Sequence, residues 1–158
     1  MWIMDFEASG LSKKSYPIEV GVTNGSDSED FLIKPMSHWT YWNADAESTH
    51  GISKSELNTK GVDSFEVAKF LNKKLNNSIV YCDSINWDGF WLNVLFSDRG
   101  ISPSFKLMDI HDLLETDHIF EKYIKAKIGL INSGDYKEHR ALDDAKVIYQ
   151  SLAYALNL

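Results

Sequence analysis

Asp5 and Glu7 stand one residue apart at the end of the apolar run over residues 2–4. Side chains alternate along a strand, so these two carboxylates point the same way, roughly 7 Å apart, with Phe6 on the opposite face. Neighbouring carboxylates repel each other and lose hydration, and a bound cation relieves both effects. Because oxygen ligands of this kind suit Mg²⁺ or Mn²⁺, the pair indicates a metal site. The alternative is an acidic strand end exposed to water.

Asp88 is a third acid in an unexpected position. A helix predicted over residues 87–99 places Asp88 on the same apolar stripe as Trp91 and Leu95, where an unpartnered carboxylate is unfavourable. The alternative is a carboxylate that stabilises the N-terminus of its own helix. Asp83, which follows the preceding strand, is an alternative for the relevant acid, but no periodicity of the sequence buries it.

A histidine and a fourth acid lie near the C-terminus. On the helix predicted over residues 141–156, Asp144 falls on the apolar stripe and Asp143 on a more mixed face, so Asp144 is the better candidate for burial. On a continuous helix His139 would be rotated about 140° from Asp144. The two converge only if His139 lies on a loop before the helix, which the turn-like residues 132–135 favour.

These five residues fit one kind of chemistry. Carboxylates that hold two divalent ions about 4 Å apart bind both the attacking and the leaving oxygen of a phosphodiester. A histidine with a pKa near neutrality takes the proton from the attacking water. The sequence therefore indicates two-metal phosphodiester hydrolysis.

The predicted elements form an α/β arrangement. Strands are predicted at residues 2–7, 18–22, 31–33, 79–82 and 106–108, and helices at 43–50, 65–75, 87–99, 111–114, 120–128 and 141–156. Asn24-Gly25 marks a hairpin turn between the second and third strands. Three antiparallel strands followed by strands that alternate with helices predict a five-stranded mixed sheet, parallel in its later part and flanked by helices. We expect a single domain over residues 1–158.

Composition limits the class of protein. The 158 residues are 44% hydrophobic and 25% charged, as in an ordinary globular protein. No apolar stretch is long enough to span a membrane and the N-terminus becomes acidic too early for a secretory signal, so we expect a cytoplasmic protein. The net charge of −7 argues against a polyanionic partner unless several acids bind divalent ions, each of which cancels two charges.

The order and spacing of the acidic motifs resemble a known superfamily. The Asp-x-Glu pair on the first strand, Asp88 in an Asp-x-x-Trp-Leu motif, and His139 five residues before Asp144 are similar to the three motifs of the DEDDh 3′-5′ exonucleases. That superfamily includes proofreading exonuclease subunits, ribonuclease T and oligoribonuclease. The His-Gly-Ile run at residues 50–52 also matches a signature common in these enzymes, and residues 15–21 resemble a small, poorly characterised branch. The resemblance covers nearly the whole chain and implies a ribonuclease H-like fold.

The resemblance also implies roles for the residues. Asp5, Glu7 and Asp144 would hold a first metal ion. Asp5 would also bind the second ion, Asp88 would support that ion partly through water, and His139 would act as the general base. The implied cofactors are two Mg²⁺ or Mn²⁺ ions, and the implied reaction removes nucleoside 5′-monophosphates from the 3′ end of single-stranded RNA or DNA.

Further residues are candidates for substrate binding. By the same resemblance the backbone of Ala8 and the side chain of Leu11 contact the terminal nucleotide. His50 joins them as a candidate, with a structural role at its helix end as the alternative. Arg140 is expected to contact phosphate. Nearby lysines share this expectation, with a solvated helix face as the alternative for those at 122–127; they are Lys13, Lys14, Lys122, Lys125, Lys127 and Lys137.

Two other classes of function remain open. One is a nucleic-acid-binding or interaction module that keeps the fold without turnover, and the other is a ribonuclease H-like endonuclease. Residues 83–87 depart from the His-Asn-Ala-x-Phe run common in the family, and the resemblance gives no preference between RNA and DNA. Relatives in the superfamily include dimers, so a homodimer is also possible.

Overall fold

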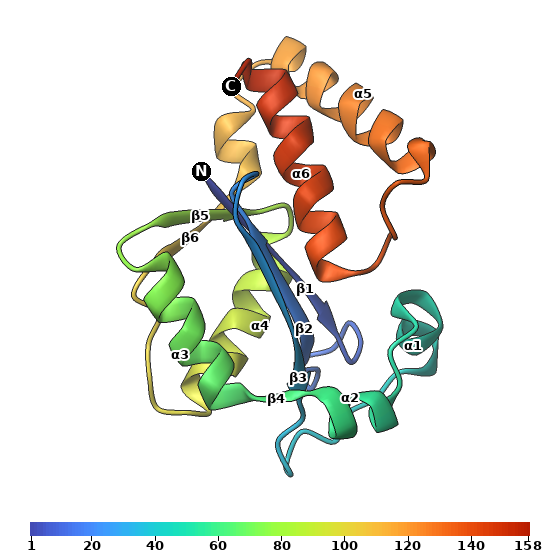
Figure 1. Ribbon diagram of the computed structural model, residues 1–158, viewed down its shortest axis with the longest axis vertical. Coiled ribbons are helices and arrows are strands. Elements are labelled where there is room, and N and C mark those ends of the chain that lie inside the picture. The colour runs from blue at the N-terminus through green and yellow to red at the C-terminus, as the bar shows by residue number, and fades with distance from the viewer.

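Strand β1, which carries the first two acids, lies in the middle of a mixed sheet in the computed structural model, which describes residues 1–158 (Figure 1). The sheet has six strands in the order β4-β3-β2-β1-β5-β6. Pairing is antiparallel for β1 with β2 and for β2 with β3, and parallel for the others. The strands are β1 (Trp2–Ala8), β2 (Pro17–Thr23), β3 (Ser28–Lys34), β4 (Val62–Asp63), β5 (Ile79–Cys82) and β6 (Lys106–Asp109).

The prediction of five strands is wrong by one, because β4 was not expected. This strand has two residues, which is too short to carry a period-two pattern. It forms because Val62 and Asp63 pair in parallel with the outer edge of β3, opposite Ile33 and Lys34. The mixed character of the sheet, antiparallel first and then parallel, is confirmed.

Six predicted helices are confirmed within a few residues at each end. The structure adds α2, whose Ser53 accepts a hydrogen bond from the Glu56 amide at 3.1 Å, a capping pattern that the apolar periodicity did not reveal. No helix is both long and apolar enough to cross a membrane. The helices are α1 (Ala44–His50), α2 (Lys54–Lys60), α3 (Ser64–Leu75), α4 (Ile85–Ser97), the 3₁₀ helix η1 (Ile110–Leu113), α5 (Asp117–Ser133) and α6 (Ala141–Leu156).

Helices cover both faces of the sheet. Figure 1 shows α3 and α4 on one side of β1–β3 and α5 and α6 on the other. Met4 and Phe6 belong to the larger apolar core, which includes α3 and α4, whereas Ile3 packs with residues of α6. Since side chains alternate along β1, Asp5 and Glu7 lie on the same face as Ile3, towards α6.

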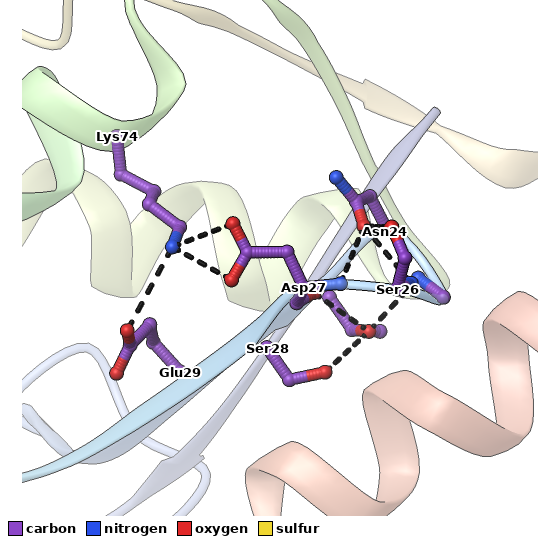
Figure 2. A network of polar contacts seen from close by, with 8 residues as sticks. Asn24, Ser26, Asp27, Ser28, Glu29 and Lys74 are labelled. Carbon is purple, nitrogen blue, oxygen red and sulfur yellow. Dashed lines mark hydrogen bonds and ion pairs between the residues drawn. The ribbon is translucent and has the colours of Figure 1, made fainter.

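The β2–β3 hairpin is closed by its own polar residues and by α3. The Asn24 side chain accepts hydrogen bonds from the amides of Ser26 and Asp27, at 3.1 and 2.8 Å, which confirms the predicted turn. Figure 2 shows Lys74 of α3 reaching the hairpin, where its ammonium lies 2.7 Å from the Asp27 carboxylate and 3.7 Å from that of Glu29. These contacts join α3 to the start of β3, far from the acidic motifs in sequence.

Candidate metal centre

Asp5 and Glu7 are half-buried on β1, while Phe6 between them is buried on the opposite face. The alternation predicted from the sequence is therefore confirmed. The pairing register with β2 shifts between Glu7 and Ala8, so the strand is irregular at the end that carries the acids. Irregularities of this kind re-aim side chains next to binding sites.

The structure brings the separate motifs together in two groups of possible metal ligands. Within each group the ligand atoms lie within 4.8 Å of one another. One group joins β1 to the start of α6, and the other joins β1 to the end of β5 and to α4. The groups are Glu7, His139 and Asp144, and Asp5, Asp83 and Asp88.

Asp88 lies in the first turn of α4 and is only 2% exposed. Its Oδ2 atom is buried and has no hydrogen-bond partner. A buried carboxylate oxygen without a partner is unfavourable by at least a kilocalorie per mole or so. A divalent ion between Asp5 and Asp88 would satisfy this oxygen, so the residues present fit a metal.

His139 lies on the loop before α6, as the convergence of His139 and Asp144 requires. Its backbone is in the left-handed region, with φ at 60°. The His139 amide donates a hydrogen bond to Oδ2 of Asp144 at 2.9 Å, which fixes the loop against the helix. The His139 side chain is exposed and is accessible to water.

The acids of the site strongly perturb one another. Burial, and then the charges of Asp88 and Asp83, raise the pKa of Asp5 well above its ordinary value. Burial and the charge of Asp83 raise the pKa of Asp88 to about 8. Two unit charges about 5 Å apart repel by roughly 3 kcal/mol at an effective dielectric constant of about 20. The group therefore needs either protons or a cation to be stable.

The second group shows the same effect. Burial and the charge of Asp144 raise the pKa of Glu7 to about 8. Burial raises the pKa of Asp144 to about 6, although the His139 backbone hydrogen bond opposes this rise. Perturbed carboxylates that share a cleft are typical of functional sites.

Asp83 lies with Asp5 and Asp88 at the site, although no periodicity of the sequence predicts its burial. Strands β1 and β5 are parallel, with Ile3 opposite Tyr81, so continuing this register puts Asp83 opposite Asp5. The carboxyl ends of adjacent parallel strands meet at one edge of a sheet, and this rule is the signal that points to Asp83. Asp83 is bound by Lys127 of α5, whose ammonium lies 2.8 Å from Oδ2.

Two pockets adjoin at the site. The smaller has a volume of about 330 Å³ and contains most of the acids together with Lys127. The larger has a volume of about 510 Å³ and extends towards α1. Glu7 and His139 line both pockets, so they form the boundary between them.

Three of the four predicted substrate-binding residues line the larger pocket: Ala8, Leu11 and His50. The Leu11 side chain is 71% exposed, as expected for a residue that contacts a ligand rather than the core. His50 is buried, and its Nδ1 accepts a hydrogen bond from the Ile52 amide at 3.0 Å. Its Nε2 is buried without a hydrogen-bond partner, and burial lowers the pKa of the ring, so in the neutral ring Nε2 carries the proton.

Arg140, the fourth residue, lines neither pocket. Its Nε and Nη2 atoms donate hydrogen bonds to buried Glu19 on β2, at 3.1 and 2.6 Å. Nη1 is not bonded to Glu19. Lys13 and Lys14 line neither of these pockets. They line a third pocket of about 590 Å³, together with Tyr41 in the loop before α1.

No protein-family model and no curated protein matches this chain. Solved structures do match. Exonuclease I from Methylocaldum szegediense has a TM-score of 0.71 at 14% identity, over 96% of this chain and 39% of that chain. E. coli exonuclease I in complex with a dA16 oligonucleotide has a TM-score of 0.74 at 13% identity, over 96% of this chain and 40% of that chain. The zinc-bound E. coli ExoI-ssDNA complex has a TM-score of 0.65 at 12% identity, over 96% and 39%.

These comparisons show the class of fold. The chain has a DEDDh exonuclease-like fold, the α/β arrangement of the ribonuclease H-like proteins, as its motifs indicated. In particular, it is similar to the exonuclease I proteins, of whose length it spans about two fifths.

Proposed function

We propose that this chain is a metal-dependent 3′-5′ exonuclease that releases nucleoside 5′-monophosphates from single-stranded RNA or DNA. One observation carries the proposal. Acids from three distant segments gather around β1, and the buried Oδ2 of Asp88, beside Asp5 and Asp83, has no protein partner. The exonuclease I-like fold and the oligonucleotide complexes of two similar structures support it.

The residues divide into two metal positions. Glu7 and Asp144, with Asp5 nearby on β1, would hold the first Mg²⁺ or Mn²⁺ ion. Asp5 and Asp88 would hold the second ion. When bound, the two ions stabilise the charge that develops on the attacking and leaving oxygens of the phosphodiester.

His139 is proposed as the general base. It lies beside Glu7 and Asp144 and faces the boundary between the two pockets, where an attacking water has access. The imidazole takes the proton of that water as the oxygen attacks phosphorus and the bond from phosphorus to the 3′ oxygen of the preceding nucleotide breaks. The leaving oxygen takes a proton from solvent, and the imidazolium returns its own proton to solvent. The hydrogen bond from the His139 amide to Asp144 holds the ring near the acids.

The larger pocket is proposed to hold the terminal nucleotide. Its volume of about 510 Å³ suits a small-molecule ligand. The backbone of Ala8 would contact the 3′ hydroxyl, Leu11 would pack against the last base, and the free Nε2 of His50 would donate to the nucleotide. The preference between RNA and DNA depends on a contact to one 2′ hydroxyl.

Arg140 remains proposed as a phosphate contact through Nη1, the nitrogen that Glu19 does not bind. If Arg140 contacts phosphate, Arg140→Ala weakens oligonucleotide binding and flattens its dependence on salt concentration. An unchanged salt slope in a filter-binding or anisotropy titration would limit Arg140 to its ion pair with Glu19.

The deciding experiment incubates the protein with 5′-labelled RNA and DNA oligonucleotides and Mn²⁺, beside an Asp144→Ala control. We expect a ladder that shortens one nucleotide at a time from the 3′ end, absent in the control and in EDTA. Internal cleavage would support the endonuclease alternative. Binding without any cleavage would support the non-catalytic module and overturn the proposal.

A further inference from the structure

We infer that Asp83 is a third carboxylate ligand of the ion at Asp5 and Asp88, and that Lys127 competes with this ion for Asp83. The inference deepens the proposed function, on which it relies only for the presence of a divalent ion at the site. It assigns roles to two residues that lie outside the acidic motifs, one at the end of β5 and one on α5.

The position of Asp83 supports its role as a ligand. One carboxylate oxygen of Asp83 lies within 4.8 Å of ligand atoms of both Asp5 and Asp88. A separate observation points to a bound cation at this place, because Oδ2 of Asp88 is buried and unpartnered. An ion that satisfies Asp88 therefore lies within reach of the Asp83 carboxylate.

Lys127 is singled out among the lysines of α5 by its position. Its ammonium lies 2.8 Å from Oδ2 of Asp83 and 5.9 Å from the centre of the Tyr123 ring, and it lines the pocket of the acids. Lys125, two residues earlier, is exposed and has no acidic partner. Lys127 is therefore the lysine that lies beside Asp5, Asp83 and Asp88, and its ammonium binds an oxygen of Asp83 that an ion could use.

The balance of charge explains the arrangement. Three ionised carboxylates carry a charge of −3, and one ammonium reduces this to −2, which a single divalent ion neutralises. If the ion binds Asp83 through Oδ2, the ammonium must leave that oxygen, because the two cations repel each other at close range. A lysine suits this role, since its flexible stem allows the ammonium to move and its charge is compact. The pair thus lowers the affinity of the ion at Asp5 and Asp88.

The test is a calorimetric titration of the metal-free protein with Mn²⁺, without nucleic acid, at constant pH. Asp83→Asn should weaken the affected site about tenfold or more, the scale of losing a supporting ligand. Lys127→Met should tighten it about fivefold, which corresponds to roughly 1 kcal/mol. Lys125→Met is the matched control and should leave both affinity and stoichiometry unchanged.

The double variant Asp83→Asn/Lys127→Met separates competition from a general field effect. If Lys127 acts through Asp83, Lys127→Met no longer tightens Mn²⁺ binding once Asp83 is replaced. A gain in Mn²⁺ affinity that persists in the double variant would overturn the competition, and unchanged Mn²⁺ binding in Asp83→Asn would overturn the ligand role.

Because Lys127→Met leaves three carboxylates uncompensated, its metal-free melting temperature is measured first. Asp83→Asn removes a charge from the cluster and tests the ligand role even if Lys127→Met unfolds.

These outcomes are distinct from those that test the exonuclease itself. If the protein binds Mn²⁺ through Asp83 but cleaves no oligonucleotide, the inference stands and the proposed function is overturned. If the unchanged protein cleaves oligonucleotides but Asp83→Asn binds Mn²⁺ with unaltered affinity, the proposed function stands and the inference is overturned.

Discussion

His139 combines a chemical role with an unusual backbone conformation. Its φ of 60° is unfavourable for most residues, but asparagine adopts it readily. His139→Asn therefore removes the imidazole without straining the loop. We expect it to lower the hydrolysis rate by about 10²–10⁴-fold, the usual contribution of a general base, with an unchanged melting temperature.

The comparison with His139→Ala checks this account. Alanine keeps neither the ring nor the preference for a positive φ, so this variant should be equally inactive and also less stable. Near-normal hydrolysis by His139→Asn in single-turnover assays would exclude His139 as the base.

Asp5→Asn should separate metal binding from folding. Asparagine has nearly the same shape but no charge, so it removes repulsion among Asp5, Asp83 and Asp88. In EDTA at pH 8 we expect a higher melting temperature than that of the unchanged protein. In contrast, Mn²⁺ at one hundred times its Kd should raise the free energy of unfolding of the unchanged protein by about 2.7 kcal/mol. The same concentration should raise that of Asp5→Asn only slightly.

Thermal unfolding followed by circular dichroism, with and without Mn²⁺, measures both effects. Asp27→Asn on the β2–β3 hairpin serves as the control, since Asp27 binds Lys74 (Figure 2) and belongs to neither group of possible metal ligands. A variant Asp5→Asn that is stabilised by Mn²⁺ as much as the unchanged protein would contradict the assignment of Asp5 as a ligand.

The acids differed in how far the sequence alone could identify them. Asp88 was predicted because it breaks an apolar helical stripe, and its 2% exposure confirms that it is buried. Asp83 was named only as an alternative to Asp88, because it follows a strand and its neighbours in sequence give no sign of burial; the structure groups both acids with Asp5. Glu19 was also missed as a candidate: it lies in a strand where every residue is buried, and its partner Arg140 is 121 residues away.

At the scale of elements, β2 holds the start of α6 in place. Helix α6 has no side-chain cap of its own, and the Ala141 amide instead donates to the Glu19 carboxylate at 3.0 Å. Gly21, two residues along β2, lies against the backbone of Leu142 so closely that a Cβ would overlap it. This joint sets the position of the loop and helix that carry the histidine and the last acid.

Glu19→Gln should loosen this joint. The substitution leaves the Arg140 guanidinium without its charged partner and weakens the cap of α6, so we expect a loss of about 2–4 kcal/mol in the free energy of unfolding. Urea denaturation measures it. The matched control is Asp27→Asn, which breaks the half-exposed ion pair to Lys74 and should cost about 1 kcal/mol or less. Equal losses in the two variants would refute a special role for Glu19.

Elements with strong local signals were predicted well. Helix α1 begins after Asn43, which caps it, and ends at Gly51, which has a φ of 70°. Strand β4 has no such signal, because two residues become a strand only when the edge of β3 is present to pair with them. Short elements of this kind depend on the tertiary structure rather than on local sequence.

At the scale of the whole molecule, the acids should make stability depend on pH and metal together. Folding raises the pKa of Glu7 and Asp88 to about 8 and that of Asp144 to about 6, above ordinary carboxyl values near 4. Between these values the folded state binds more protons than the unfolded state. The stabilisation that these three acids give the metal-free protein is therefore complete below about pH 4 and is lost as the pH rises to about 8.

Melting temperatures in EDTA and in Mn²⁺ across pH 5 to 8.5 test this dependence. We expect the metal-free melting temperature to fall over this range, and the stabilisation by Mn²⁺ to grow, because ions bind the deprotonated acids. A metal-free protein that becomes more stable towards pH 8 would contradict the arrangement of acids described above.

The fold as a whole was more predictable than its sequence similarity suggests. The order of strands and helices and the spacing of five polar residues indicated the exonuclease-like fold, although the similar structures share only 12–14% of their residues with this chain. Core positions tolerate other apolar residues of suitable volume, so a fold can persist at low sequence identity. Positions with a buried charged side chain, such as Asp88, tolerate fewer substitutions.

The central place of β1 in the sheet has one further consequence. This strand pairs with β2 along nearly its whole length and with β5 at Trp2 and Ile3, so deuterium should reach its paired amides only when the entire molecule unfolds. The amide of His139 is held by a single bond in an exposed loop and should exchange far sooner. Protection from exchange should therefore be highest on the β1 side of the site and lowest on the loop that carries His139.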